Sequence, residues 1–161
     1  MNTDEDVQRI RAQEQALVLP RLDETVAFEL GAHIREHALR ENLSLVCDIR
    51  TWDRQLFFCA TAGTSLDNAE WVRRKINAVK RFQRSSYQLA LERGPGAITA
   101  ERGLDVFEYA FAGGGFPLRV EGAGIVGCLT ISGLPQRQDH AVAVGALCAH
   151  LGVDAATLQL P

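Results

Sequence analysis

The chain has 161 residues, a formal net charge of −3, 47% hydrophobic residues and 23% charged residues. This length and composition fit one globular domain that buries a core of its own, and they argue against disorder. The mildly negative charge argues against generic phosphate-backbone binding, so we expect no nucleic-acid partner. No window approaches the roughly 20 apolar residues that span a bilayer, so we expect no membrane segment.

The N-terminal stretch is acidic and polar, where a secretory signal would be basic and then apolar. We therefore expect a cytoplasmic protein. Residues 4–17 can form a helix that ends before Pro20, because proline does not continue a helix.

A helix is predicted over residues 23–41. Asp23 is a suitable N-cap and Asn42 a suitable stop. The apolar residues of this segment recur at helical spacing, at Val26, Leu30, Ile34 and Ala38. His33 and His37 are four residues apart and share one helix face, where two imidazoles can hold a metal or a haem iron. No Glu lies between them in an HExxH arrangement, so exposed surface histidines are the simpler interpretation.

Residues 44–50 and 55–60 are two apolar segments that flank a short polar turn, which predicts a β-hairpin. If the turn centres on Asp53, Cys47 and Cys59 lie opposite each other. We interpret this proximity mainly as side-chain packing, and a redox role for the two thiols is a secondary hypothesis.

Thr64 and Asp67 have the spacing of a capping box, which predicts the start of a long helix. The helix is expected to run to about Leu91, before Gly94 and Pro95. Its inner face carries Val72, Ile76 and Val79. Its opposite face carries Arg73, Asn77, Lys80 and Arg84.

Six of the 17 basic residues fall between positions 73 and 84, with no acidic residue among them. A solvated helix face explains most stripes of this kind. The alternative is a ligand or subunit contact, because guanidinium groups suit carboxylates and protein interfaces.

Residues 113–115 are three glycines that introduce a second predicted hairpin, with strands at 116–121 and 125–132. Its turn begins the string GAGIVG, which matches the GxGxxG pattern of dinucleotide-binding proteins. That motif functions only where its glycines open a helix. A strand-like run follows instead, so the hairpin is the preferred interpretation.

The chain leaves this strand at residues 132–134, and Pro135 favours the first turn of a last helix that ends at Gly152. Free N–H groups at such a helix start can bind a carboxylate or phosphate, or can be satisfied locally by a hydroxyl and water. Asp139 and His140 lie in the first turns and suggest acid–base chemistry, although neighbouring helical side chains do not face each other.

The cysteines at 47, 59, 128 and 148 show neither CxxC spacing nor a compact His/Cys cluster, so no metal site is predicted. Free, mostly buried thiols are expected. The chain has no nucleophile elbow, P-loop or Cys/His catalytic motif, so the sequence assigns no enzyme class.

Two segments, 63–92 and 111–147, together carry a family resemblance. The residues that carry it are Asp67-Asn68, Trp71, Arg73-Arg74-Lys75, Arg81-Phe82, Ser85-Ser86, Gly114, Phe116-Pro117, Ser132-Gly133-Leu134-Pro135 and Asp139-His140. Through them the chain resembles the GlcG/HbpS-like superfamily, known as the haem-degrading domain family, and within it a branch of small cytoplasmic proteins. The resemblance covers residues 22–153.

The resemblance implies a single α/β domain (α+β type) with profilin-like layering, in which an antiparallel sheet built from two β-hairpins is covered by helices. This domain would occupy residues 22–153, between an N-terminal extension at 1–21 and a C-terminal tail at 154–161. Relatives include a haem-binding sensor component, a glycolate-utilisation protein and a domain attached to a cobalamin adenosyltransferase. The resemblance therefore implies tetrapyrrole or organic-acid binding, haem as a possible cofactor, and assembly into homo-oligomers. It transfers no axial haem ligand onto this chain.

Two functional hypotheses follow. In the first, a small anionic ligand or tetrapyrrole binds between the start of the 67–91 helix, the 113–117 loop and the start of the last helix. Arginines would hold its carboxylates and aromatic rings would pack on its plane, with haem degradation as an activity to test. In the second, the same surfaces form a homo-oligomer and present a platform to a protein partner, without catalysis.

The candidate ligand-binding residues are Asn68, Trp71, Arg73, Arg74, Lys75, Gly114, Phe116, Pro117, Ser132, Gly133, Asp139 and His140.

Overall fold

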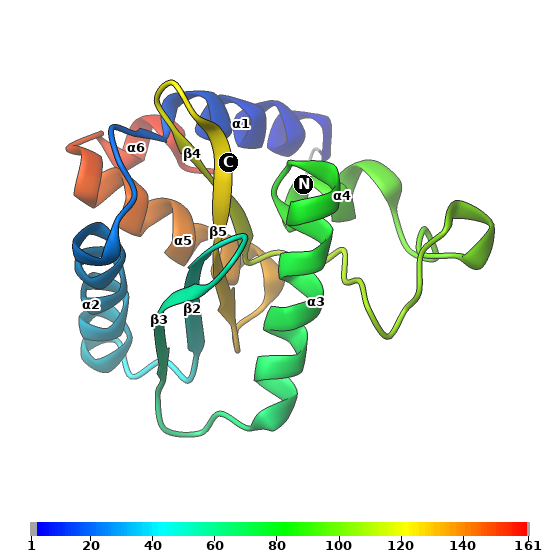
Figure 1. Cartoon of the computed structure of the whole chain (residues 1–161), viewed down its shortest axis with the longest axis horizontal. Helices are drawn as coiled ribbons and strands as arrows, with labels where there is room; N and C mark the ends of the chain where they lie inside the picture. Colours follow the sequence, from blue (N-terminus) through cyan, green and yellow to red (C-terminus); the bar gives the residue numbers. More distant parts are fainter. Residues whose placement is uncertain (1–2, 161) are drawn as a thin grey trace.

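The computed structural model describes residues 3–160. A five-stranded sheet with the strand order β1-β4-β5-β2-β3 forms its centre (Figure 1). The strands are β1 (Val18–Leu19), β2 (Val46–Thr51), β3 (Gln55–Ala60), β4 (Gly115–Val120) and β5 (Gly124–Ser132). The helices are α1 (Thr3–Ala16), α2 (Glu24–Arg40), α3 (Leu66–Phe82), α4 (Ser86–Arg93), α5 (Gln136–Leu151) and α6 (Ala155–Leu158), with a short 3-10 helix η1 (Ala100–Arg102).

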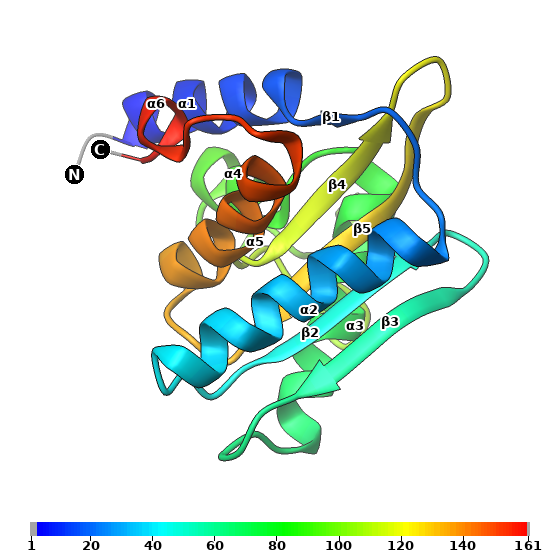
Figure 2. The same cartoon turned by 90° about the vertical axis from the view of Figure 1, so that its left-hand side faces the viewer.

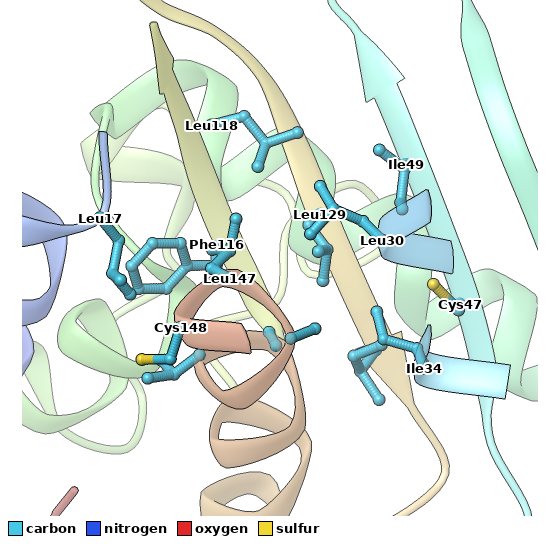
Figure 3. Packing of buried hydrophobic residues seen from close by; sticks show 14 of the residues in the cluster. Leu17, Leu30, Ile34, Cys47, Ile49, Phe116, Leu118, Leu129, Leu147 and Cys148 are labelled. Atoms are coloured by element: carbon cyan, nitrogen blue, oxygen red, sulfur yellow. The ribbon is translucent and has the colours of Figure 1, made fainter. Parts of the chain in front are cut away.

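Helices cover both faces of the sheet, with α2 and α5 on one face and α3 on the other (Figure 2). The face under α2 and α5 holds the larger core. Strand residues Ile49, Phe116 and Leu129 are completely buried there against Leu30 of α2 and Leu147 of α5 (Figure 3). This layered α/β arrangement confirms the predicted fold class.

The face under α3 is packed by the inner stripe of that helix. Val72, Ile76 and Val79 contact the strand residues Val46 and Cys128, as their spacing predicted. Of the basic residues of α3, Lys80 and Arg81 are exposed and Arg73 and Arg74 half-buried, whereas Lys75 is buried.

Both predicted hairpins are confirmed. In the first, β2 pairs antiparallel with β3, and Cys47 lies opposite Cys59. In the second, β4 pairs antiparallel with β5 through a turn in which Gly122 and Gly124 have φ values of 73° and 80°. The GxGxxG string therefore opens a strand, and the sheet hydrogen bonds of β5 leave no helix N-terminus there for a nucleotide phosphate. The short strand β1 adds a parallel edge beside β4, which the sequence did not predict.

The prediction for α3 was wrong at both ends. The capping residue is Ser65, whose N–H donates to Asn68 Oδ1 at 2.9 Å, whereas the Thr64 hydroxyl donates to a carbonyl of the preceding turn. The helix also ends at Phe82 and not near Leu91, because Gln83 adopts a left-handed conformation with φ 56°. A second helix, α4, then starts after its own cap, Ser85. Residues 83–85 are polar and separate α3 from α4, because local hydrogen bonds end the first helix and cap the second. Apolar residues continue on both sides of this break, which is why the sequence predicted one long helix.

The predicted start of α2 and the predicted end of α5 agree with the structure. Asp23 caps α2 by accepting from the N–H of Val26 at 2.9 Å, and Gly152 ends α5 with φ 67°. The N-terminal residues form α1 as expected, and its Ile10 is fully buried. None of the described helices combines the length and hydropathy needed to cross a bilayer.

Candidate ligand-binding site

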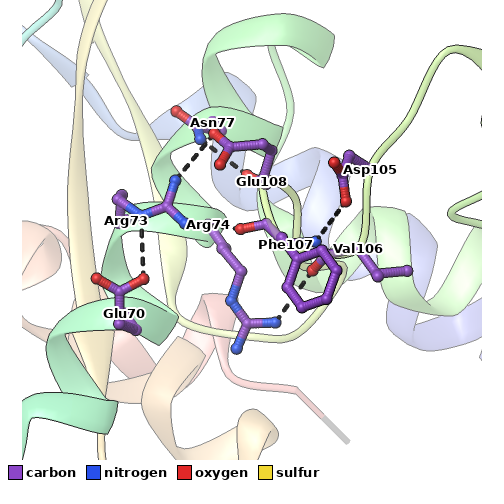
Figure 4. Close-up of polar contacts among 8 residues, drawn as sticks. All are labelled: Glu70, Arg73, Arg74, Asn77, Asp105, Val106, Phe107 and Glu108. Atoms are coloured by element: carbon purple, nitrogen blue, oxygen red, sulfur yellow. Dashed lines mark hydrogen bonds and ion pairs between the residues drawn. The ribbon is translucent and has the colours of Figure 1, made fainter.

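The basic face of α3 is engaged by an internal loop. Arg73 donates to Glu70 at 3.1 Å, to Glu108 at 2.9 Å and to the carbonyl oxygen of Phe107 at 2.6 Å (Figure 4). Asn77 donates to the carbonyl oxygen of Glu108 at 2.8 Å. The guanidinium and amide groups on the face predicted to contact a ligand or subunit therefore hold residues 106–108 onto the helix.

Beside these contacts lies an exposed apolar surface, which we call the aromatic patch. It consists of Trp71, Val106 and Phe107, with exposed fractions of 37%, 53% and 76%. The guanidinium carbon of Arg74 lies 4.2 Å from the centre of the Trp71 ring, and its Nη1 donates to the carbonyl oxygen of Val106 at 3.4 Å. The patch combines exposed aromatic rings with arginine, which is the composition enriched at protein interfaces.

The next residue of α3, Lys75, is buried. Its Nζ lies 2.9 Å from Asp139 Oδ2 and 2.9 Å from the carbonyl oxygen of Ile131. The other carboxylate oxygen of Asp139 accepts from the N–H of Leu134 at 2.9 Å. Burial lowers the pKa of Lys75 and raises the pKa of Asp139, while their mutual attraction opposes both shifts.

The backbone around this ion pair is closely packed. A Cβ on Gly114 would collide with the carbonyl oxygen of Ile131, and one on Gly133 would collide with that of Ser44. Four of the candidate residues therefore meet at one place, which we call the junction: Lys75, Gly114, Gly133 and Asp139. The junction joins α3, the glycine segment, the end of β5 and the start of α5. The ion pair and backbone fill this junction.

Two other candidate residues lie on the opposite side of the sheet. Phe116 and His140 are both completely buried, with ring centres 5.8 Å apart, and Tyr87 packs against the same imidazole at 5.3 Å. His140 Nε2 lies 2.8 Å from Gln13 Oε1, and its Nδ1 has no partner among the described residues. Desolvation lowers the pKa of His140 to about 3, so the ring is neutral at physiological pH.

The remaining candidates have local structural roles. Asn68 caps α3, Pro117 lies opposite Cys128 within the β4–β5 pair, and Ser132 is buried at the end of β5 opposite Val46. The twelve predicted residues therefore occupy three places: the buried junction, the α3 surface and the core.

The structure adds a site that the candidate residues do not include, an open groove between α2 and α5 with a volume of about 480 Å³. We call it the α2–α5 groove. Its apolar lining includes Ile34, Leu43, Leu134, Val142 and Ala146, and its polar lining includes His33, His37, Glu41 and Gln138.

Small residues of α5 leave this space open. Ala141 and Gly145 face the groove, and a Cβ built on Gly145 would meet no heavy atom within 4 Å. The sequence signal for the site is the i, i+4 pair His33 and His37. His33 is exposed, as the simpler interpretation expects, and His37 is half-buried. The helix that supplies the opposite wall could not be identified from spacing along α2 alone.

A smaller cavity of about 180 Å³ lies between β2, β3 and α3. The carboxylate of Asp48 is buried in it, where Arg50 donates at 2.6 and 2.7 Å and Gln55 at 2.5 Å. Three donors already occupy this carboxylate. Over residues 3–160, no three His, Cys, Asp or Glu side chains gather as a metal-binding set.

The sheet, covered by α2 and α5 on one face and by α3 on the other (Figure 2), defines a layered α/β domain with an open groove between α2 and α5. The chain belongs to the HbpS-like family, since the family model described as "Haem degrading protein HbpS-like" matches residues 22–148.

Individual relatives agree with this assignment. The chain is 51% identical over 158 residues to the UPF0303 protein mlr5144 of Mesorhizobium japonicum, covering 97% of this chain and 95% of that protein. The crystal structure of the Ybr137w protein has a TM-score of 0.85 and 31% identity, over 91% of this chain and 88% of that one. A PduOC:heme complex has the same fold, with a TM-score of 0.69 and 22% identity, over 83% of this chain and 97% of that one.

Proposed function

We propose that this protein binds haem, or another tetrapyrrole of similar shape, in the α2–α5 groove. The observation that carries the proposal is the pairing of an apolar groove with two imidazoles on one helix face, His33 and His37. A tetrapyrrole has an apolar plane and carboxylate side chains, and a bound haem iron accepts an imidazole nitrogen.

The groove meets the physical requirements of such a ligand. Its volume of about 480 Å³ falls in the usual range for small-molecule sites, roughly 300–1,000 Å³. Leu43 and Val142 offer half-buried apolar surface to the groove. Arg40 contacts His37, and a guanidinium at that end can bind a carboxylate.

The two histidines are not equivalent. Arg40 Nη2 lies 3.1 Å from His37 Nδ1, and a guanidinium can only donate, so Nδ1 of His37 accepts. The neutral ring then carries its proton on Nε2, which is the nitrogen it would need for a metal. No contact of this kind constrains His33 among the described residues, so His33 would hold the iron of a bound haem and His37 would act as a positioning residue.

Family membership and fold support the same ligand class. The matching family model is described as haem degrading, and PduOC, which has the same fold, forms a haem complex. A bound haem would supply an iron centre with redox chemistry. The residues that line the groove would bind it. Haem breakdown is a further activity to test once binding is measured.

The test is a titration of the purified protein with hemin, followed at the Soret band. We expect saturable one-to-one binding that His33→Ala weakens by roughly tenfold or more, since an iron ligand is lost. His150→Ala is the matched control, because His150 faces Glu29 and does not line the groove. Equal titrations of the native protein and His33→Ala would contradict the proposal.

A steric variant tests the location independently. Gly145→Leu places a side chain in the groove, and because nothing contacts the added Cβ it should leave the fold intact. Ala149→Leu is the matched control on the exposed side of the same helix. We expect Gly145→Leu to abolish one-to-one binding and Ala149→Leu to leave it unchanged, and binding that survives in Gly145→Leu would place the ligand elsewhere.

The aromatic patch favours a second candidate function, self-association. Phe107 is a large aromatic side chain that is 76% exposed, beside Trp71 and Arg74. Exposed aromatic residues next to arginine are typical centres of protein contacts. We propose that the patch contacts a second copy of the chain, in keeping with the homo-oligomers that the family resemblance implies.

A further inference from the structure

Two cysteines face each other across the edge hairpin. Cys47 of β2 and Cys59 of β3 are direct Cα partners in the antiparallel pair. Opposed residues of this kind point to the same face of a sheet and have Cα atoms about 4.5–5.5 Å apart. A disulfide needs a Cα separation of about 4.4–6.8 Å. The Cα separation of the two cysteines is therefore within the range that a disulfide requires.

The two thiols differ in their access to solvent. Cys47 is completely buried in the core, whereas Cys59 is only half-buried on β3, the edge strand of the sheet. Cys128 and Cys148 are 0% and 1% exposed. A reagent in solution can therefore reach Cys59 while the other three thiols are protected.

The surroundings of Cys59 favour its thiolate form. The neighbouring Cys47 thiol and the positive charge of Arg35 on α2 favour the thiolate, so the pKa of Cys59 falls to about 7. The interaction with Cys59, together with burial, raises the pKa of Cys47 well above its ordinary value. One proton is thus held on Cys47 while Cys59 carries the negative charge.

We propose that Cys59 and Cys47 form a redox-active thiol pair, in which Cys59 is oxidised by a hydroperoxide and Cys47 closes a disulfide between β2 and β3. In the first step the Cys59 thiolate attacks one peroxide oxygen, the O–O bond breaks, and hydroxide or alkoxide leaves. Cys59 then carries a sulfenic acid. In the second step the Cys47 sulfur attacks Cys59, the S–O bond breaks, and the thiol proton leaves with the hydroxyl group as water.

The pair loses two electrons in total, which the peroxide accepts, and a thiol reductant restores it. Neither cysteine lines the α2–α5 groove, so this chemistry is independent of ligand binding there.

The first test measures the reactivity of each thiol. Native protein is alkylated with iodoacetamide between pH 5 and 10, and the rate at each cysteine is followed by mass spectrometry of tryptic peptides. At pH 7 a thiol with a pKa near 7 is about half thiolate, against roughly 3% for an ordinary one near 8.5. Because nucleophilicity falls with the pKa, the expected gain in rate is several-fold.

Two variants separate the causes. Arg35→Gln changes an exposed residue and should not affect folding, and Cys47→Ala removes the neighbouring thiol. Both should move the inflection of the Cys59 profile to higher pH. An inflection at or above pH 8.5 in the native protein, or a profile unchanged in both variants, would overturn the assignment of Cys59 as the reactive thiol.

The second test uses hydrogen peroxide and a non-reducing tryptic map. Arg50 and Arg54 lie between the two cysteines, so trypsin separates them and an intramolecular disulfide appears as a linked peptide pair. We expect this pair to form in native protein and to disappear after reduction. In Cys47→Ala, dimedone should instead trap a sulfenic acid on Cys59. No linked pair, or irreversible oxidation of Cys59 alone, would refute the proposed cycle.

Discussion

Lys75 and Asp139 form a buried ion pair that joins the middle of α3 to the first turn of α5. Their charged atoms lie 2.9 Å apart, and the two side chains are 4% and 3% exposed. Each group also has a backbone partner, Ile131 for the ammonium and Leu134 for the carboxylate. The pair therefore satisfies two groups that would be costly to bury separately.

We predict that removing one partner destabilises the fold strongly. Lys75→Met leaves the Asp139 carboxylate buried without a counter-charge, which should reduce the free energy of unfolding by about 3–5 kcal/mol. Urea unfolding at pH 7 measures this value. Glu70→Gln, at an exposed ion pair with Arg73, is the control and should change stability by less than about 1 kcal/mol.

The double variant Lys75→Met/Asp139→Leu should recover much of this loss, since no unpaired charge remains. A cost for Lys75→Met no larger than that for Glu70→Gln would show that the pair contributes little to folding.

His140 predicts a specific dependence of stability on pH. Its pKa is about 3 in the folded protein and about 6.5 when unfolded, so as the pH falls the unfolded chain takes up the proton first. Stability is therefore lost as the pH falls below about 6.5 and continues to fall towards 3.

Between pH 7 and pH 5 this effect amounts to about 2 kcal/mol. We expect the free energy of unfolding to fall by that much more in the native protein than in His140→Gln. His150→Gln is the control, because His150 is a partly exposed imidazole beside Glu29. Parallel pH profiles for native protein and His140→Gln would show that the buried ring does not resist protonation.

Gly114 should not tolerate a side chain. Its φ is 126°, and a Cβ there would collide with the carbonyl oxygen of Ile131 and lie 2.8 Å from Lys75 Nζ. We predict that Gly114→Ala reduces the free energy of unfolding by about 3 kcal/mol, measured by urea unfolding.

Gly122→Ala is its matched control, because Gly122 also has a positive φ, 73°, but nothing within 4 Å of an added Cβ. Its expected cost is about 1 kcal/mol, from backbone conformation alone. Similar losses for the two variants would mean that the close approach at Gly114 is unimportant.

The aromatic patch predicts a concentration-dependent assembly that Phe107 controls. Phe107→Ser should weaken self-association by about 30-fold or more, which corresponds to the 2 kcal/mol of an interface hot spot. Light scattering after size-exclusion chromatography, at several protein concentrations, gives the masses. Leu39→Ser, at an exposed apolar residue at the end of α2, is the control. An unchanged mass in Phe107→Ser would exclude the patch as the contact.

Much of the fold could be predicted because its signals are local. Asp23 caps α2, because its carboxylate accepts from the N–H three residues later. Gly152 ends α5, because glycine readily adopts the left-handed conformation found there. The first hairpin followed from two apolar runs around a polar turn, which also placed Cys47 opposite Cys59. These features depend on neighbours within a few residues or across one turn.

The roles of individual polar residues could not be predicted in the same way. Arg74 and Lys75 are adjacent in the sequence and both carry a positive charge, yet Lys75 is buried against Asp139 and Arg74 stacks on the exposed Trp71 ring. Asp139 and Lys75 are 64 residues apart. Only the packing of α3 and α5 against β5 selects this partner.

The sequence by itself determined the hairpins, the cap of α2, the end of α5 and the apolar faces, because hydrogen bonding and side-chain periodicity act over short stretches of chain. The tertiary structure decided which charges are paired, that Phe116 and His140 belong to the core, and that Gly145 and His33 face one groove. Those outcomes depend on distances between elements far apart in the chain, and only the packed sheet and its helices set these distances.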